Sequence, residues 1–450
     1  MSQTPVAPLT RTAVIAGAVP IMIANAATPI VGLVDTFVIG HYAGTIALAG
    51  IGLGAVIYGI FYWGFGFLRM STAGLSAQAD GAGRQHDVQA HLFRAVPLGF
   101  GIGVVLFALQ LILLALLMPL YPAEAKVAAG ARSYLMARFW GLPAILSSIA
   151  LMGWFIGLAR PRRALYMQII LNLVNIPLSI LFVAQFGWGL FGVGIASAIA
   201  EWVGLIAGLI LAAQEIKIRG GFDPRALKLN TLLDIPALKK LGAANSNLFI
   251  RTLSINFGFL FFAHAATKQG TVFLAGYHIL MQFITMIALV LDSFANVAEA
   301  HVGAAYGAHN PHRFNRAVRL TTELSFGFAV LCALLVYVGG PFLIDALTQD
   351  PLVQASAGRY LFLCALAPLL GFSAWQMDGI FIGLTRTAAM RNASIAAVLI
   401  YLGLHMVLEP RFGGFGVWAA FLGYYIARAV CMVPAWPAIL RDVRAPSVQT

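Results

Sequence analysis

The chain has 450 residues, of which 60% are hydrophobic and only 10% are charged. A soluble protein of this length needs far more charge to cover its surface, so the composition indicates a polytopic membrane protein. The net charge of +12 then favours anionic lipid headgroups as a partner. Nucleic-acid binding is excluded, because no soluble domain is left to perform it.

Twelve apolar stretches are long enough to cross a bilayer, which takes about 20 helical residues. In chain order they cover residues 13–39, 46–68, 93–118, 131–157, 164–185, 190–213, 242–265, 271–297, 317–344, 355–384, 388–408 and 415–438. The sequence therefore predicts an all-α integral membrane protein with six transmembrane helices in each half.

The basic residues predict the orientation of these helices. Most of them fall in connections on one side of the membrane, above all in segment 214–241, which also contains Gly220, Gly221 and Pro224. Both termini are therefore predicted to be cytoplasmic. Segment 214–241 is predicted to be a basic cytoplasmic linker between an N-terminal lobe, residues 1–213, and a C-terminal lobe, residues 242–450.

Short tracts of the chain occur twice. Residues 44–50 (GTIALAG) return at 270–276 (GTVFLAG), and residues 155–160 (FIGLAR) return at 381–386 (FIGLTR). Because each copy has an even number of spans, the second copy enters the membrane from the same side as the first. The sequence predicts two parallel six-helix repeats around a central cleft, an arrangement that transporters favour.

Transport by such a chain needs an energy source. The sequence contains no G-x-x-x-x-G-K-[ST] phosphate-binding loop, so we expect ions to drive transport. Ionisable groups inside a bilayer are costly and usually functional. The acidic residues in the predicted spans are Asp35, Glu201, Asp292, Glu299, Glu323 and Asp378.

Asp35 lies towards the outer end of the first span. It follows Pro20 and Pro29, which remove backbone donors and are predicted to bend the helix. The freed carbonyl groups could then face a cavity. The alternative is that Asp35 is a solvated carboxylate at the end of its helix.

A polar stripe on the fifth span supplies groups that match Asp35. Gln168, Asn172, Asn175 and Ser179 follow one helical face, and Ser197 on the sixth span lies at a similar depth. Such a stripe could hold helices together or bind an ion or a substrate. Its depth favours a site with Asp35.

A second stripe follows the eighth span, with His278, Gln282, Thr285, Asp292, Asn296 and Glu299. Asp378 on the tenth span and Arg251 on the seventh lie at its inner depth. Arg251 would need a buried anion, so an ion pair with Asp292 or a neighbour explains part of this set. Structural pairing and substrate contact both stay open for Gln282, Asp292, Asp378 and Arg251.

Three motifs that contain these residues resemble the multidrug and toxic compound extrusion (MATE) family, and within it the DinF branch. They are residues 34–40 (VDTFVIG), 292–307 (DSFANVAEAHVGAAYG) and 378–386 (DGIFIGLTR). The resemblance covers the whole chain. It implies two six-helix lobes around a cleft and export of cationic amphiphilic compounds in exchange for H⁺ or Na⁺, in a bacterial inner membrane.

The resemblance also implies roles for individual residues. In this branch the aspartate of the first helix, here Asp35, is the proposed proton site, and its partners correspond to Asn175, Ser179 and Ser197. Ser179 stands where the family pattern usually has a second carboxylate. This departure favours H⁺ over Na⁺, because it removes an anionic ion ligand.

From these observations we predict a monomeric, proton-coupled antiporter in which a proton and a cationic substrate compete for Asp35. We expect no enzymatic activity, cofactor or metal site, since the histidines form no set such as H-E-x-x-H. The alternative is a flippase of the same superfamily that moves a lipid-linked or envelope precursor. Such a protein would need basic residues in its cleft, and Arg251 is the one candidate.

Overall fold

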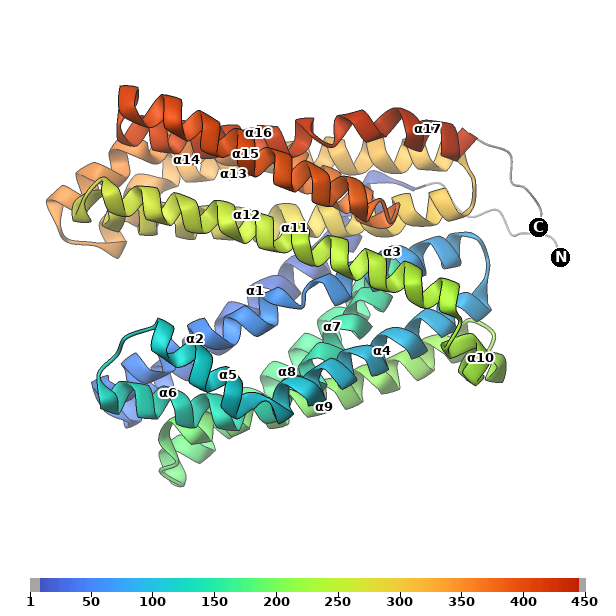
Figure 1. Ribbon diagram of the computed structural model, residues 1–450, viewed down its shortest axis with the longest axis horizontal. Coiled ribbons are helices and arrows are strands. Elements are labelled where there is room, and N and C mark those ends of the chain that lie inside the picture. The colour runs from blue at the N-terminus through green and yellow to red at the C-terminus, as the bar shows by residue number, and fades with distance from the viewer. Residues whose placement is uncertain (1–8, 445–450) are drawn as a thin grey trace. The chain divides into compact units, whose positions relative to one another are not determined.

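The computed structural model describes residues 9–444, and within that range the chain forms helices and no strands (Figure 1). In this part of the chain, twelve helical segments are long and apolar enough to cross a membrane. They are Arg11–Tyr42, Gly44–Gly81, Gln85–Ala108, Ala125–Gly157, Pro161–Gln185, Gly189–Ile218, Leu229–Lys268, Thr271–Gly307, Pro311–Leu347, Pro351–Gly383, Thr387–Phe412 and Gly414–Arg444. Each overlaps one predicted span, which confirms the predicted all-α class and the number and order of the spans.

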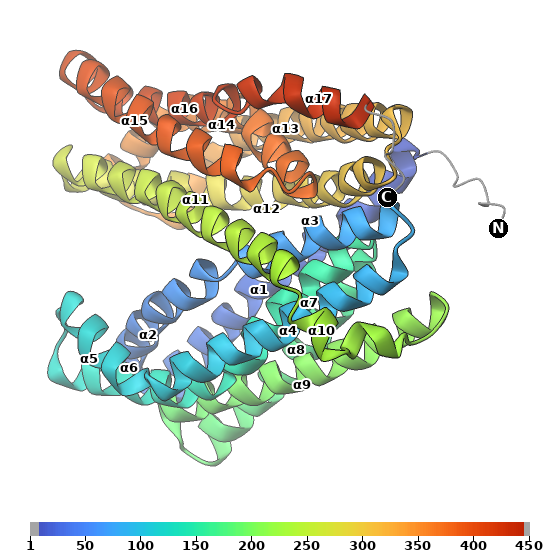
Figure 2. The ribbon, with the colours of Figure 1, turned by 45° about the vertical axis from the view of Figure 1, so that its right-hand side comes forward.

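The chain divides into two compact units, of which the N-terminal unit comprises residues 20–241. It contains most of α1 (Arg11–Tyr42), then α2 (Gly44–Gly64), α3 (Phe67–Gly81), α4 (Gln85–Ala108), α5 (Gln110–Leu117), η1 (Met118–Leu120), α6 (Ala125–Arg138), η2 (Phe139–Gly141), α7 (Leu142–Gly157), α8 (Pro161–Ile180), η3 (Leu181–Gln185), α9 (Gly189–Ile218), η4 (Pro224–Leu227) and α10 (Leu229–Leu232). Because α7 carries apolar and small residues and no charge, it is buried along nearly its whole length. It packs against α3, α4 and α9, as Figure 2 shows.

The C-terminal unit comprises residues 9–19 and 242–444. Its elements are α11 (Ile235–Lys268), α12 (Thr271–Gly307), α13 (Pro311–Leu347), α14 (Pro351–Gly383), α15 (Thr387–Phe412), α16 (Gly414–Val430), η5 (Val433–Ala435) and α17 (Trp436–Arg444). Helix α14 packs against α12, α13 and α16, and α15 packs against α16. Large aromatic side chains fill the core, with Phe262, Trp418 and Phe421 fully buried.

The duplication is visible in close helix contacts that recur in each unit. A Cβ atom on Gly153 would lie 2.2 Å from a carbonyl oxygen of α3, and one on Gly379 would lie 2.2 Å from a carbonyl oxygen of α12. One turn later, Gly157 and Gly383 make the same approach, each at 2.4 Å. Only glycine allows these backbones to meet, so both copies of the repeat use the same glycines for the same contact.

The predicted linker, residues 214–241, is mostly helical. Helix α9 continues to Ile218, and η4, α10 and the start of α11 follow. The segment packs on α4, where Nδ1 of His86 lies 3.0 Å from Oδ2 of Asp223 and Nε2 of Gln89 donates to the carbonyl of Gly221 at 3.0 Å. It therefore groups with the N-terminal unit.

Helix α1 passes from one unit into the other. Its first turns belong to the C-terminal unit, where Arg11 forms an ion pair with Glu323 at 2.9 Å, and the N-terminal unit begins at Pro20. The amino-terminal bound of the units therefore differs from that of the predicted lobes. The helix itself runs continuously past both prolines that were predicted to bend it, and the side chain of Pro29 lies outside the described part of the structure.

Candidate functional site

The carboxylate of Asp35 lies inside the N-terminal unit. The side chain is 4% exposed, and the hydroxyl of Ser179 on α8 donates a hydrogen bond to its Oδ1 at 2.9 Å. Ser179 is itself fully buried. The structure thus brings together the two residues on which the predicted proton site depends, and it places the carboxylate away from water.

The rest of the α8 stripe connects α1 to α9. Nδ2 of Asn175 donates to the hydroxyl of Ser197 at 2.9 Å. One turn earlier, Nδ2 of Asn172 donates to the carbonyl of Ala27 in α1 at 3.1 Å, and Gln168 donates to Asn172 at 3.0 Å. Asn172, Asn175 and Ser179 therefore direct their polar groups towards neighbouring helices of the unit, whereas Gln168 bonds within α8.

Asn175 keeps an unused acceptor. Its Oδ1 atom is buried and receives no hydrogen bond from any described residue. Buried polar atoms are normally paired, so an acceptor left open one helical turn from Ser179 offers a place for a proton donor. The O–H of a protonated carboxyl group or the N–H of a bound cation could fill it.

A second group of ionisable side chains lies in the same unit and was not predicted as a site. Nη2 of Arg138, at the end of α6, lies 3.3 Å from Oε1 of Glu201 on α9. The hydroxyl of Tyr58 on α2 donates to the same oxygen at 3.0 Å, and the Arg138 guanidinium lies 4.1 Å from the centre of the Tyr58 ring. The Glu201 side chain is 3% exposed. Glu201 was recognised as an acid within a span, but nothing in the sequence linked it to Arg138.

The C-terminal unit contains a different arrangement around Asp378 on α14. Arg251 on α11 and Arg428 on α16 both form ion pairs with its Oδ2 atom, the latter at 2.6 Å. Tyr424 and Tyr425 flank Arg428, with ring centres within 6 Å of its guanidinium. Arg251 therefore does have a buried anion, and that anion is Asp378.

The other second-lobe candidates lie on α12 and are exposed. Gln282 and Asp292 both present their side chains at the surface of the chain, although Asp292 acts electrostatically on the buried Tyr425. Towards the end of α12 the stripe becomes buried, at Asn296 and Glu299. The predicted stripe thus changes from exposed to buried along its helix.

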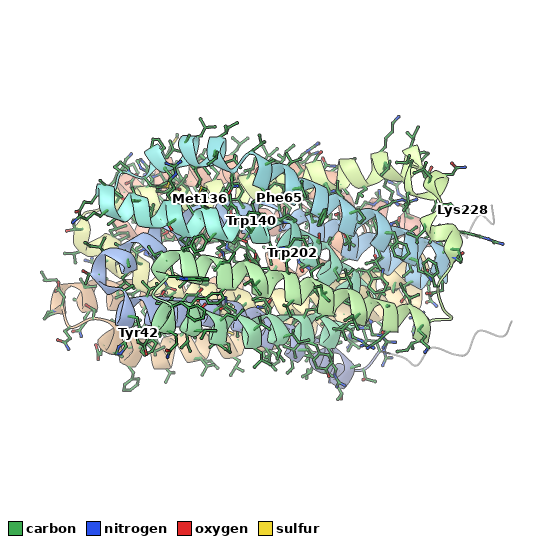
Figure 3. The ribbon with its side chains drawn as sticks, turned by 90° about the horizontal axis from the view of Figure 1, so that it is seen from below. Tyr42, Phe65, Met136, Trp140, Trp202 and Lys228 are labelled. Atoms are coloured by element: carbon green, nitrogen blue, oxygen red, sulfur yellow. The ribbon has the colours of Figure 1, made fainter. Side chains whose placement is uncertain are left out.

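Large aromatic side chains are exposed on the N-terminal unit. Trp140 and Trp202 lie close together in Figure 3, and Nε1 of Trp202 donates to the carbonyl of Trp140 at 3.0 Å. Exposed aromatic side chains such as these are expected where a protein faces lipid, because the bilayer takes the place of water.

Twelve apolar spans, a duplicated architecture and buried ionisable groups define a multi-pass membrane transporter. One family model, MatE, matches the chain twice, over residues 20–181 and over residues 248–409. The chain belongs to the MatE family. The two matches confirm the internal duplication, and the family is the one that the sequence motifs resembled.

Relatives with known names cover nearly the full chain. It is 30% identical over 419 residues to the DNA damage-inducible protein F of Escherichia coli (strain K12), covering 93% of this chain and 90% of that protein. It is 26% identical over 439 residues to the multidrug resistance protein MdtK of Pectobacterium atrosepticum, covering 92% and 93%. A solved structure of a MOP superfamily transporter from Pyrococcus furiosus has a similar fold, with a TM-score of 0.83 at 17% identity over 97% of both chains.

Proposed function

We propose that this transporter exports cationic amphiphilic compounds in exchange for protons, with Asp35 as the proton site. The observation that carries the proposal is the environment of this carboxylate. It is 4% exposed, its hydrogen-bond donor is the neutral hydroxyl of Ser179, and among the described residues no basic side chain forms an ion pair with it. A buried acid without an ion-pair partner becomes neutral by binding a proton or a cation.

The coupling follows from competition for one negative charge. Low dielectric favours the neutral form of a carboxyl group, so Asp35 would bind a proton when its side of the transporter opens to a more acidic exterior. A cationic substrate binds Asp35 most strongly when the proton has left and the carboxylate is ionised. Alternating exposure of the site to the two sides of the membrane then links proton entry to substrate exit.

Helix α1 is the proposed element that responds to the proton. Asp35 and both prolines lie on it, and a proline donates no hydrogen bond to the carbonyl group four residues earlier. Protonation would change the hydrogen bond between Asp35 and Ser179, which holds α1 against α8. A helix weakened at Pro20 and Pro29 is the part of the unit that could take two shapes at low cost.

The polar groups around Asp35 support H⁺ rather than Na⁺ as the coupling ion. A proton needs one carboxylate, whereas a metal cation needs several oxygen ligands and gains from each additional negative charge. Ser179 supplies a neutral oxygen where a second carboxylate would favour a metal ion. Asp378 is a poor alternative, since Arg251 and Arg428 already neutralise it.

The remaining features of the proposal concern the surroundings of the transporter. We place it as a monomer in a bacterial inner membrane, with anionic lipids at its basic connections and both termini in the cytoplasm; residues 1–8 and 445–450 lie outside the described structure. Gln282 and Asp292, which are exposed on α12, are proposed substrate contacts of the C-terminal unit.

The test uses the purified full chain in proteoliposomes. Ethidium movement is recorded under an imposed pH gradient and then under a Na⁺ gradient at constant pH, for the parent, Asp35→Asn and the surface control Asp345→Asn. We expect the pH gradient alone to drive the parent and Asp345→Asn, and Asp35→Asn to lose this response. Equal transport on Na⁺ alone, or an undiminished response of Asp35→Asn, would refute the proposal.

A flippase for an anionic lipid-linked precursor is the second candidate, and the two buried arginines at Asp378 favour it. Ethidium accumulation in pump-deficient cells separates the two functions. A drug exporter lowers accumulation when it is expressed, whereas a flippase leaves it unchanged.

A further inference from the structure

The ion pair of Arg138 and Glu201 lies in the same unit as Asp35, and the proposed antiport does not explain it. Its members come from α6 and α9, with Tyr58 on α2 bonded to Glu201 and Tyr134 on α6 beside Arg138. Charged groups within a membrane span are rare and costly. We therefore expect Arg138 and Glu201 to have a role beyond packing.

The pair is incompletely bonded. Arg138 and Glu201 share one contact, at 3.3 Å, whereas charge-assisted hydrogen bonds are usually about 2.7–2.9 Å. Nε of Arg138 and Oε2 of Glu201 are buried and have no hydrogen-bond partner among the described residues. The carboxylate packs directly against Gly141, where an added Cβ atom would lie 1.8 Å from Oε2. The guanidinium therefore has an N–H group that is not used in a hydrogen bond.

Arg138 also acts on Asp35. Glu201, the partner of Arg138, lies one turn after Ser197 on α9, and Ser197 is bonded to Asn175, one turn before the Ser179 that donates to Asp35. From this position the guanidinium exerts an electrostatic effect on both carboxylates. Tyr134, one turn before Arg138 on α6, interacts electrostatically with the same two carboxylates. Asp35 and Glu201 thus share one base, Arg138.

Asp35, Glu201 and Arg138 together set the net charge of the site. With Asp35 and Glu201 ionised and Arg138 always protonated, the sum is minus one. An excess charge in a membrane interior is unfavourable, and one proton or one monovalent cation removes it. Two protons, or a divalent cation, would leave the group positive.

We propose that Arg138 and Glu201 form a positioning pair that fixes the net charge of the N-terminal site at minus one, and so selects monovalent cations as substrates. Arg138 neutralises Glu201, which leaves Asp35 as the single charge that the proton and the substrate share. The inference rests on the proposed function, because it assigns the substrate charge for that same site.

Charge variants of the pair make opposite predictions. Arg138→Gln leaves two unneutralised carboxylates, so the site should favour propidium, a dication, over ethidium, a monocation with the same ring system. In Glu201→Gln the sum is zero and Arg138 turns to Asp35, so ethidium binding should weaken about tenfold or more. The double variant Arg138→Gln/Glu201→Gln restores minus one and should recover the preference for ethidium.

The measurement is equilibrium binding of ethidium and propidium to the purified full chain by fluorescence anisotropy, with no ion gradient. Thermal unfolding of each variant checks that it folds, and Arg138→Lys, which keeps the charge, should keep the monocation preference. A double variant as weak as Glu201→Gln, or an Arg138→Gln protein that still prefers ethidium, would overturn the inference. A parent that binds ethidium but is not driven by a pH gradient contradicts the proposed proton coupling instead.

Discussion

The hydrogen bond from Ser179 to Asp35 allows a quantitative prediction. It is 2.9 Å long, and both side chains are buried. A hydrogen bond to a charged group contributes about 1.5–3 kcal/mol, and the hydroxyl stabilises the ionised carboxylate more than the neutral acid. In Ser179→Ala the ionised form loses this donor, so Asp35 retains its proton to a higher pH.

The size of the shift follows from the energy. About 1.4 kcal/mol corresponds to one pH unit, so losing the whole bond would move the midpoint of Asp35 protonation up by about one to two pH units. Because ethidium binds when the proton has left, the midpoint of ethidium binding should rise by the same amount. Transport by Ser179→Ala should remain driven by H⁺.

Ser179→Asp changes the site in a different way. Two neighbouring carboxylates titrate as a pair, and one of them holds its proton to a still higher pH. The pair also supplies a second anionic ligand. This variant should therefore show a raised midpoint together with new sensitivity to Na⁺, which Ser179→Ala should lack.

The assay is ethidium binding to purified protein as a function of pH, with and without Na⁺. Ser147→Ala is the matched control, since its buried hydroxyl donates to the carbonyl of Pro143 at 2.7 Å and to no carboxylate. We expect its midpoint to equal that of the parent. An unchanged midpoint in Ser179→Ala, or a protein as inactive as Asp35→Asn, would show that this serine does not act on the protonation of Asp35.

Three further predictions concern stability in detergent, measured by thermal unfolding. Gly153→Ala should destabilise the protein by about 1–3 kcal/mol or more, because its methyl group would overlap the backbone of α3. Asp378→Asn should cost about 3–5 kcal/mol, since it leaves two buried arginines without their anion. Asp223→Asn should destabilise at pH 7 and lose this effect as the pH falls through the folded pKa, because the backbone N–H of Arg225 and then His86 hold the pKa of Asp223 below its usual range.

The sign of the Asp223 effect follows from linkage. A group whose pKa is lower in the folded state contributes stability above its unfolded pKa, and this stability is lost as the pH falls through the folded value. Asp345→Asn, at an exposed position, is the matched control for the loss of one carboxylate. Constant destabilisation by Asp223→Asn at every pH would contradict the linkage argument.

The other two predictions also have matched controls. Gly101→Ala on α4 introduces a methyl group that meets nothing within 4 Å, so it should be neutral or slightly stabilising. Asp35→Asn removes a buried acid that forms no ion pair among the described residues, so it should not destabilise the fold as Asp378→Asn does. Equal losses of unfolding free energy in Gly101→Ala and Gly153→Ala, or in both aspartate variants, would show that these contacts do not contribute the stated energies.

The fold was largely predictable because bilayer physics leaves a strong signal. Spans appear as long apolar runs, and the repeat appears as matching tracts. The breaks within spans were not predictable. The predicted span 93–118, for example, is interrupted at Leu109, where α4 ends and α5 begins. Neither proline nor glycine lies within five residues of Leu109, so nothing in the sequence predicted the break.

Helical periodicity predicted part of the candidate site, because Asn175 and Ser179 lie on the same face of one helix. The depth of the residues in their spans also grouped Asp35 with this face, but the partners of the buried arginines were not predicted. Arg138 and Glu201 lie on α6 and α9, and Asp378 receives its two arginines from α11 and α16. Such pairs depend on which helices are neighbours, and periodicity in a single sequence does not reveal this.

The competition between a proton and a cationic substrate for Asp35 can be measured without any gradient. Ethidium is added to purified protein in weakly buffered solution near the midpoint of its pH dependence, and a pH indicator records the protons released. The account predicts release of up to about one proton per ethidium bound by the parent, and none by Asp35→Asn. Binding by the parent without proton release, or equal release from Asp35→Asn, would contradict it.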